Sequence, residues 1–387
     1  MPTLNTRAVH AGRDDLVELG VHAVPLDLST TYPSRDSRTE AGRLDVLCTG
    51  AQVDGPPVYA RAGNPTVARF ETAMAELEGC EAAVAFASGM AALSACLLAG
   101  VSSGKPHVVA VRPLYGSSDH LIGSGLLGTQ VTWARPDEVA GAIREDTGLV
   151  IVETPANPTL SETNLRRLSD ACGPVPLLAD NTFATPALQR PAEHGARIVL
   201  HSATKFLGGH GDVLGGVVTC DEEYARRLRQ LRFLTGATLH PLAGYLLLRG
   251  LSTLPLRMRA ASETAAELAT RLADHPQIAK VHYPGRNENR PEKQMTGGGP
   301  MLAVEVHGDP HAVIGAVRLF TPAVSLGSVD SLIQHPGSLS HHIMDPADRA
   351  EGGISEQLLR ISVGLEDVED LWADLGQALA ASGSSVG

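Results

Sequence analysis

One lysine in the chain stands where its amine could react with a carbonyl compound. Residues 201–205 read HSATK, so Lys205 follows a mostly apolar run at 197–200 that predicts the end of a buried strand. Ser202 and Thr204 precede the lysine, and a glycine-rich segment at 206–212 follows it. Lysine forms Schiff bases with aldehydes, and burial shifts its pKa readily. Taken alone, however, such a run is more often a lysine in a solvated loop.

A second apolar run, at 175–179, leads into Asp180. An aspartate at the end of a strand could cap the next helix or bind a metal ion. It could also pair with the pyridinium nitrogen of pyridoxal 5′-phosphate (PLP), a cofactor that needs an acidic partner to accept electrons from a substrate. Asp180 and Lys205 together are therefore compatible with PLP chemistry, and the two other roles of the aspartate stay open at this point.

With these motifs the chain resembles the Cys/Met-metabolism family of PLP-dependent enzymes, which includes cystathionine γ-synthases, cystathionine and methionine γ-lyases and homoserine sulfhydrylases. The resemblance implies an α/β fold, namely the PLP-dependent transferase fold of the aspartate-aminotransferase type (fold type I). It also implies that Lys205 binds PLP and moves protons during catalysis. Asp180 would keep the cofactor's ring nitrogen protonated, and the nearby Thr182 would also contact the cofactor.

Ser88, Gly89 and Met90 follow a predicted strand and begin a predicted helix. Alone, this motif is typical of a simple strand–helix turn. Backbone N–H groups at the start of a helix can also bind phosphate without a charged side chain. The resemblance implies that these residues bind the cofactor phosphate, and that the hydroxyls of Ser202 and Thr204 complete the site.

Residues 59–66 read YARAGNPT, the most specific string in the first third of the chain. Its Asn-Pro pair is typical of a turn that caps the helix starting near residue 66. The resemblance implies a further role, in which Tyr59 and Arg61 bind the cofactor phosphate of a neighbouring subunit. The active sites would then be shared within a dimer, and we expect a homotetramer built from such dimers.

Tyr115 and Asn157 follow two other predicted strands. A tyrosine at a strand end usually serves packing, and the prolines beside Asn157 make a rigid turn on their own account. The resemblance implies that Tyr115 stacks on the pyridine ring and acts as an acid or base at the leaving group. It implies that Asn157 contacts the phenolic oxygen of the cofactor.

Arg360 lies inside a predicted strand, where an outward-facing arginine would ordinarily be a solvated surface residue. The guanidinium group can also bind a carboxylate through two parallel hydrogen bonds. The resemblance assigns Arg360 to the substrate α-carboxylate. Val324, Ser325 and the segment 332–338 match the loops that surround the substrate in the family.

The pocket residues bear on which reaction is catalysed. Members that bind cystathionine commonly carry an arginine at the position of His120 and a glutamate at the position of Val324. An apolar pocket suits a small group such as S-methyl, and Val324 with the run 334–336 resembles methionine γ-lyases. Those enzymes, however, typically have a cysteine where this chain has Ser117 and a Lys-Asp pair at 232–233, where it has Arg-Phe.

We therefore expect γ-elimination from a methionine-like or homocysteine-like amino acid, giving 2-oxobutanoate, ammonia and a thiol. The alternatives are γ-replacement, as in cystathionine γ-synthases or O-acylhomoserine sulfhydrylases, and cystathionine γ-lyase activity. A catalytically silent protein with the same fold is a further alternative. The presence of Lys205, Asp180, Tyr115 and Arg360 argues against it.

Alternating apolar strands and helices between about 59 and 220 predict a mostly parallel α/β sheet covered on both faces. Ligands in such sheets bind outside the carboxyl ends of the strands, where the predicted site residues fall. We expect three units: an extended arm at 1–60 with a long loop at 34–55, a PLP-binding α/β domain at 61–245, and a C-terminal α+β domain at 246–387. The predicted elements of the last unit are helices at 246–273 (interrupted at Pro255), 313–320 and 367–381, and strands at 300–306 and 358–363.

Composition excludes several other classes of function. A net charge of −12 over 387 residues argues against nucleic acid or an anionic membrane surface as a partner. The 5 cysteines form an odd set without a Cys-x-x-Cys pair, which favours a reducing cytoplasm over disulfides or a structural metal site. Residues 82–104 carry no charge, but Ser88-Gly89 in their midst favours a strand, a turn and a buried helix over a transmembrane segment.

Overall fold

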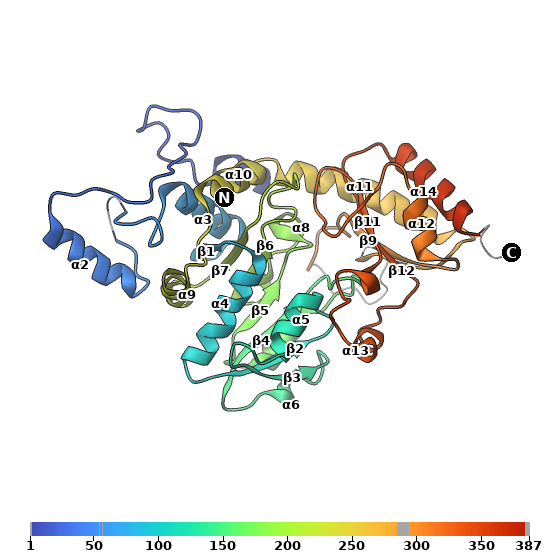
Figure 1. Ribbon diagram of the computed structural model, residues 1–387, viewed down its shortest axis with the longest axis horizontal. Helices are drawn as coiled ribbons and strands as arrows, with labels where there is room; N and C mark the ends of the chain where they lie inside the picture. Colours follow the sequence, from blue (N-terminus) through green and yellow to red (C-terminus); the bar gives the residue numbers. More distant parts are fainter. Residues whose placement is uncertain (1, 54, 56, 285–293, 384–387) are drawn as a thin grey trace.

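The computed structural model describes residues 2–53, 55, 57–284 and 294–383 of the chain. It contains two sheets, one in the first two thirds of the chain and one in the last third (Figure 1). The predicted domain boundaries at 60 and 245 stay predictions. Residues 285–293 and 384–387, which belong to the predicted C-terminal domain, lie outside the described residues.

The larger sheet has seven strands in the order β1-β7-β6-β5-β4-β2-β3. Its strands are β1 (Ala82–Phe86), β2 (His107–Val111), β3 (Gln130–Ala134), β4 (Thr147–Glu153), β5 (Leu177–Asp180), β6 (Ile198–Ser202) and β7 (Gly216–Cys220). Only β7 runs antiparallel to its neighbours, and the strands from β6 to β3 pair in parallel. The predicted mostly parallel sheet is therefore confirmed.

Helices cover both faces of this sheet (Figure 1). They are α3 (Pro65–Glu78), α4 (Gly89–Ser102), α5 (Gly116–Gly123), α6 (Val139–Ala142), α7 (Leu165–Cys172), α8 (Thr185–Leu188), the 3₁₀ turn η1 (Pro191–His194), α9 (Glu222–Thr235) and α10 (Pro241–Leu251). Successive side chains of a strand point to opposite faces. In β1, Ala83 and Ala85 pack into one hydrophobic core, and Val84 and Phe86 into another.

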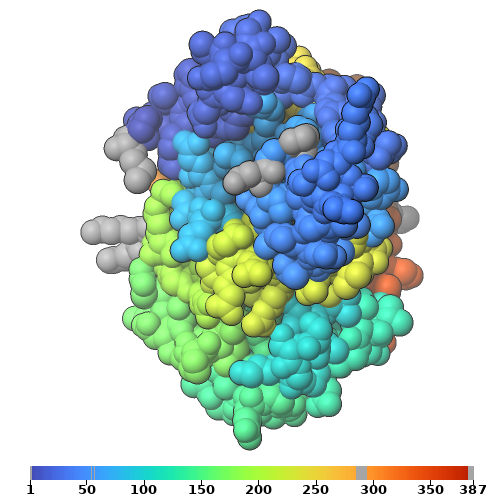
Figure 2. Space-filling model, turned by 90° about the vertical axis from the view of Figure 1, so that its left-hand side faces the viewer, coloured from blue at the N-terminus to red at the C-terminus, as the bar shows by residue number. Residues whose placement is uncertain are grey.

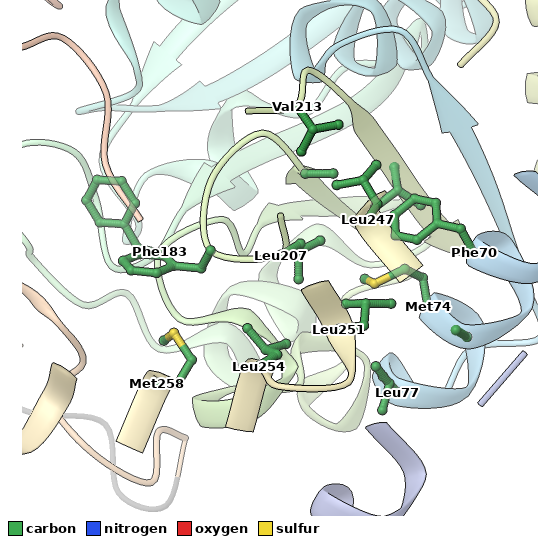
Figure 3. Close-up of a cluster of buried hydrophobic side chains, with 14 of the residues drawn as sticks. Phe70, Met74, Leu77, Phe183, Leu207, Val213, Leu247, Leu251, Leu254 and Met258 are labelled. Carbon is green, nitrogen blue, oxygen red and sulfur yellow. The ribbon is translucent and has the colours of Figure 1, made fainter. Parts of the chain in front are cut away.

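Figure 3 shows part of the first of these cores. Phe70 and Met74 of α3 pack there against Leu247 and Leu251 of α10 and against Leu207, which follows the predicted PLP-binding lysine. The lysine loop is therefore held by well-packed helices. A rigid support of this kind keeps catalytic groups in place.

The second sheet has five strands in the order β10-β11-β12-β9-β8 and is antiparallel except for the pair β10–β11. Its strands are β8 (Ile278–His282), β9 (Met301–Val306), β10 (Thr321–Pro322), β11 (Leu332–Gln334) and β12 (Leu358–Ser362). The accompanying helices are α11 (Leu254–Ala273), α12 (Pro310–Ala316), the 3₁₀ turn η3 (Pro336–Ser338), α13 (Pro346–Glu351) and α14 (Val368–Gly383). This arrangement agrees with the α+β secondary structure predicted for the C-terminal part of the chain.

Two predicted helices differ from the structure. The helix predicted at 313–320 is α12, which ends at Ala316, because the backbone N–H groups of residues 318–320 donate to the Asp374 carboxylate instead of continuing the helix. The helix predicted at 246–273 with a break at Pro255 is two helices, α10 and α11. Pro255 lies in the first turn of α11, where a missing N–H is not needed by the helix.

The prediction of a long loop at 34–55 was wrong. Residues Ser37–Cys48 form the helix α2, and the arm also contains α1 (Leu4–His10). Asp36 caps α2 by accepting hydrogen bonds from the backbone N–H groups of Arg38 and Thr39, which stabilises its first turn. The helix lies at the far left of Figure 1, and Figure 2 shows the arm, in blue, spread over the surface on that side.

Within the described residues, no helix combines the length and the hydropathy that crossing a bilayer requires. The uncharged segment 82–104 is divided between β1 and α4, as predicted.

Candidate active site

A cavity of about 210 Å³ lies at the carboxyl ends of the parallel strands, between the larger sheet and the loops of the second sheet. A single buried water needs roughly 10–15 Å³ of cavity volume, so this space can hold a small organic molecule. The predicted site residues that line it are Ser88, Gly89, Met90, Tyr115, Asn157, Asp180, Thr182, Ser202, Thr204, Lys205, Val324, Ser325 and Arg360. The structure thus brings together all of the predicted site residues except Tyr59 and Arg61.

The parallel strands place these groups side by side. Glu153 ends β4, Asp180 ends β5, and the two residues are paired in register. Ser202 ends the next strand, β6, and Tyr115 follows β2. Neighbouring strands are about 4.8 Å apart, so residues at one edge of the sheet can act on one ligand.

Lys205 lies in the cavity with its amine close to the second sheet. Its Nζ donates a hydrogen bond to Ser325 Oγ at 2.9 Å. Burial, and after it the positive charge of Arg360, lowers the pKa of Lys205 from 10.5 to about 8. A larger share of the amine is therefore neutral near pH 7, as a nucleophilic lysine requires.

Asp180 is held by the residue two positions further on. Its Oδ1 accepts hydrogen bonds from the backbone N–H of Thr182 at 3.0 Å and from the Thr182 hydroxyl. That hydroxyl oxygen in turn accepts from the backbone N–H of Ser202 at 2.9 Å. Burial raises the pKa of Asp180, and the hydrogen bonds from Thr182 partly offset this rise. A carboxylate in these surroundings gains from a cationic partner such as a protonated ring nitrogen.

The start of α4 forms a cradle without charged side chains. Ser88 is the N-cap of this helix, and its Oγ accepts from the backbone N–H of Ala91 at 3.1 Å. A Cβ atom added at Gly89 would lie 3.0 Å from Ser202 Cβ, so any other residue would force α4 and β6 slightly apart at this point. The first N–H groups of a helix have no partner within it and suit a phosphate. The predicted residues therefore fit the phosphate of PLP, and Lys205 and Asp180 fit its aldehyde and its ring nitrogen.

Arg360 is buried, with 3% of its surface exposed. Its guanidinium donates to Asn157 Oδ1 at 2.8 Å and to the backbone oxygen of Ser325 at 2.7 Å. When the Gln334 amide is turned so that its oxygen faces the guanidinium, it accepts from Nε of Arg360 at 3.0 Å. Burial lowers the pKa of Arg360 to about 10, and the group stays charged at neutral pH.

The bond to Arg360 also constrains Asn157. Because Asn157 Oδ1 accepts from the guanidinium, its amide nitrogen is the atom that can donate to a cofactor oxygen. This agrees in geometry with the predicted contact to the phenolic oxygen, which stays a prediction.

Tyr59 and Arg61 lie elsewhere. The Arg61 guanidinium is 4.3 Å from the Phe233 ring centroid and donates to the Phe233 backbone oxygen at 2.6 Å. Tyr59 is 44% exposed. Neither side chain lines the cavity of its own chain. Their predicted role at the phosphate of a neighbouring subunit stays a prediction.

The structure adds residues that the sequence reasoning did not select. Glu153, Ser340 and Leu214 also line the cavity. Glu153 was visible only as the acid before a Thr-Pro pair, and Ser340 and Leu214 come from loops whose path the sequence does not reveal. His120, by contrast, is exposed and does not line the cavity, so its replacement of arginine bears less directly on the pocket than Val324 does.

In the parts of the chain that the structure describes, no group of three or more His, Cys, Asp or Glu side chains is arranged to hold a metal ion. The polar groups around the cavity instead suit an organic cofactor and an amino acid. Its walls combine the partly buried amine of Lys205 and carboxyl of Asp180 with the buried carboxyl of Glu153 and the buried guanidinium of Arg360.

Comparison with known proteins identifies the class to which this fold and site belong. The family model described as Cys/Met metabolism PLP-dependent enzyme matches residues 5–380. The chain therefore belongs to this family, as its motifs predict, and PLP is the cofactor of the family.

Individual proteins of known name are also similar to this chain. The chain is 70% identical over 377 residues to an L-methionine gamma-lyase of Streptomyces avermitilis, covering 97% of this chain and 89% of the relative. It is 55% identical to an L-methionine gamma-lyase of Brevibacterium sandarakinum, covering 97% of both. Among solved structures, a cystathionine gamma synthase from Xanthomonas oryzae pv. oryzae superposes with a TM-score of 0.90 at 35% identity and 100% coverage of both chains. These similarities confirm the predicted fold.

Proposed function

We propose that this protein catalyses γ-elimination on methionine or a closely similar amino acid such as homocysteine. For methionine, the reaction takes up one water and yields 2-oxobutanoate, ammonia and methanethiol. The observation that carries this proposal is the apolar Val324 at the rim of a cavity that also contains Lys205 and Arg360. The relatives named L-methionine gamma-lyase support the same conclusion.

Each end of the substrate has a partner in the cavity. The Arg360 guanidinium binds the α-carboxylate, because a buried fork of N–H groups is complementary to the two carboxylate oxygens. Ser325 lies between this guanidinium and the lysine amine, with its hydroxyl accepting from Lys205 Nζ and its backbone oxygen accepting from Arg360. The α-carbon is thereby placed beside the amine. Val324, which is 53% exposed at the rim, contacts the S-methyl end, and a carbon that becomes fully buried there gains about 0.8 kcal/mol.

A bound PLP would supply an acceptor for the electron pair that remains after the α-proton is removed. Lys205 Nζ takes that proton and then delivers and removes protons along the carbon chain. Its lowered pKa lets the amine act as a base near neutral pH. The Asp180 carboxylate holds the proton on the ring nitrogen of the cofactor, and the Tyr115 hydroxyl donates a proton to the departing sulfur.

We also propose that the protein acts as a homotetramer in the cytoplasm, with Tyr59 and Arg61 of one subunit binding the cofactor phosphate of the next. The support is that both side chains lie outside the cavity of their own chain, where Arg61 instead donates to the Phe233 backbone oxygen. The odd number of 5 cysteines agrees with a reducing compartment.

The reaction is tested by identifying products. The purified holoenzyme is incubated separately with methionine, homocysteine, cystathionine and O-acylhomoserines, with and without an added thiol, and products are identified by mass spectrometry. We expect 2-oxobutanoate from methionine or homocysteine at a higher kcat/KM than from cystathionine. A preference for cystathionine would instead support cystathionine γ-lyase activity. If γ-substituted amino acids are the sole products when a thiol is supplied, the result would support γ-replacement activity.

A further inference from the structure

Glu153 is a buried carboxyl group in the wall of the cavity to which the proposed mechanism gives no role. It ends β4, is 6% exposed and is paired in register with Asp180. Burial, and after it the nearby Asp180 carboxyl, raises the pKa of Glu153 well above its ordinary value. Placing a second carboxyl beside the first is costly. Its contacts must therefore offset this cost.

Those contacts are two hydrogen bonds to the backbone. Glu153 Oε2 accepts from the N–H of Tyr115 at 2.8 Å, and Oε1 accepts from the N–H of Asn157 at 2.7 Å. Both N–H groups lie in loops, Tyr115 just before α5 and Asn157 after β4. Neither is part of the ladder of the sheet. One carboxyl group thus connects two loops that leave different strands.

The two residues held in this way are the ones assigned to opposite parts of the reacting complex. Tyr115 supplies the hydroxyl proposed to act at the departing sulfur, and Asn157 supports Arg360 through its Oδ1. Glu153 is also close enough to Arg360 for each charge to affect the pKa of the other. A displacement of about 1 Å between such groups can cost about 100-fold in rate.

We propose that Glu153 is a positioning residue of the active site, which sets the Tyr115 hydroxyl and the Asn157–Arg360 pair at fixed positions relative to Lys205. This inference rests on the proposed function for the reaction concerned. The contacts themselves do not depend on which amino acid is the substrate.

The test compares Glu153→Gln with the control Asp374→Asn. Asp374 of α14 is likewise buried and accepts from the backbone N–H groups of Arg318, Leu319 and Phe320, but it does not line the cavity. Glutamine has the shape of glutamate but replaces one acceptor oxygen with an NH₂ group, which must face one of the two backbone N–H groups. Both variants lose a buried carboxyl that accepts from backbone N–H groups, two at Glu153 and three at Asp374, so Asp374→Asn controls for general destabilisation.

Four quantities are measured for each variant: thermal stability, affinity of the apoenzyme for PLP, circular dichroism of the bound cofactor, and kcat and KM for methionine. For Glu153→Gln we expect an altered dichroic band, weaker PLP affinity and a fall in kcat of about 10- to 100-fold, since the aligned groups are displaced. For Asp374→Asn we expect lower thermal stability with the cofactor spectrum and kcat unchanged.

A Glu153→Gln holoenzyme with the wild-type spectrum, PLP affinity and kcat would overturn the proposal. If methionine is not the substrate, the cofactor spectrum and the PLP affinity still test the positioning role of Glu153. A failure of that role can therefore be told apart from a failure of the proposed reaction. If Glu153→Gln does not fold, hydrogen exchange of the wild-type apoenzyme decides instead. The amides of Tyr115 and Asn157 should exchange as slowly as amides in the strands, and rapid exchange of either would refute the positioning role.

Discussion

The amine of Lys205 should capture PLP at a pH far below that at which an exposed lysine reacts. Its pKa of about 8 leaves about a quarter of the amine neutral at pH 7.5, whereas the ordinary value of 10.5 would leave about one part in 1,000. Only the neutral amine attacks an aldehyde, so this difference is on the order of 200-fold in reactive lysine.

The assay mixes apoenzyme with excess PLP and follows the visible absorbance of the bound cofactor from pH 6 to 10. We expect the rate of capture to rise with pH and to level off above about pH 8. Arg360→Met removes the positive charge that is the second cause of the lowered pKa, so its profile should shift to higher pH. Burial remains the first cause, and the midpoint should therefore stay below 10.5.

Arg135→Met provides the control, because Arg135 is 75% exposed and outside the cavity. Its profile should match that of the wild type. A wild-type rate that still rises steeply at pH 10 would refute the inference that burial lowers the pKa of Lys205. An unchanged profile in Arg360→Met would refute the contribution of the guanidinium charge.

Three further predictions concern the phosphate site, the assembly and the substrate. Gly89→Ala should weaken PLP affinity by at least about tenfold in equilibrium titration, because its Cβ would lie 3.0 Å from Ser202 Cβ and push α4 away from β6. Mixed Arg61→Ala and Lys205→Ala subunits, each inactive alone, should regain activity in hybrid dimers, since one active site then has both intact residues. Val324→Glu should raise kcat/KM for cystathionine relative to methionine by about tenfold, because a carboxylate at the rim can pair with the distal ammonium group.

For each of these three predictions, one outcome would contradict the reasoning. Wild-type PLP affinity in Gly89→Ala would show that the close approach of α4 is not needed. Gly141→Ala serves as the control, because Gly141 lies away from the cavity and nothing lies within 4 Å of an added Cβ. Absence of activity after confirmed subunit exchange would count against shared active sites. An unchanged substrate preference in Val324→Glu, compared with Val324→Thr as a neutral variant, would exclude this residue as the determinant.

The sequence by itself determined the sheet and the order of the site along the chain. Continuous apolar runs such as 107–111 can be buried only between two layers of helices, and the structure places them there as strands. Asp180 and Lys205 were identifiable because each follows such a run. Local chemistry also set the start of α4 at Ser88-Gly89, where a hydroxyl caps a helix after a strand.

Only the tertiary structure decided how distant segments meet. No local pattern indicates that Ser325 would reach Lys205, 120 positions away, or that Arg360 would bind Asn157 across 203 positions. The proposed role of Glu153 shows the same limit, because it depends on a tyrosine in the loop that follows another strand. The helix α2 was missed for a related reason. It buries no side chain fully, so its sequence lacks the apolar periodicity by which helices are recognised.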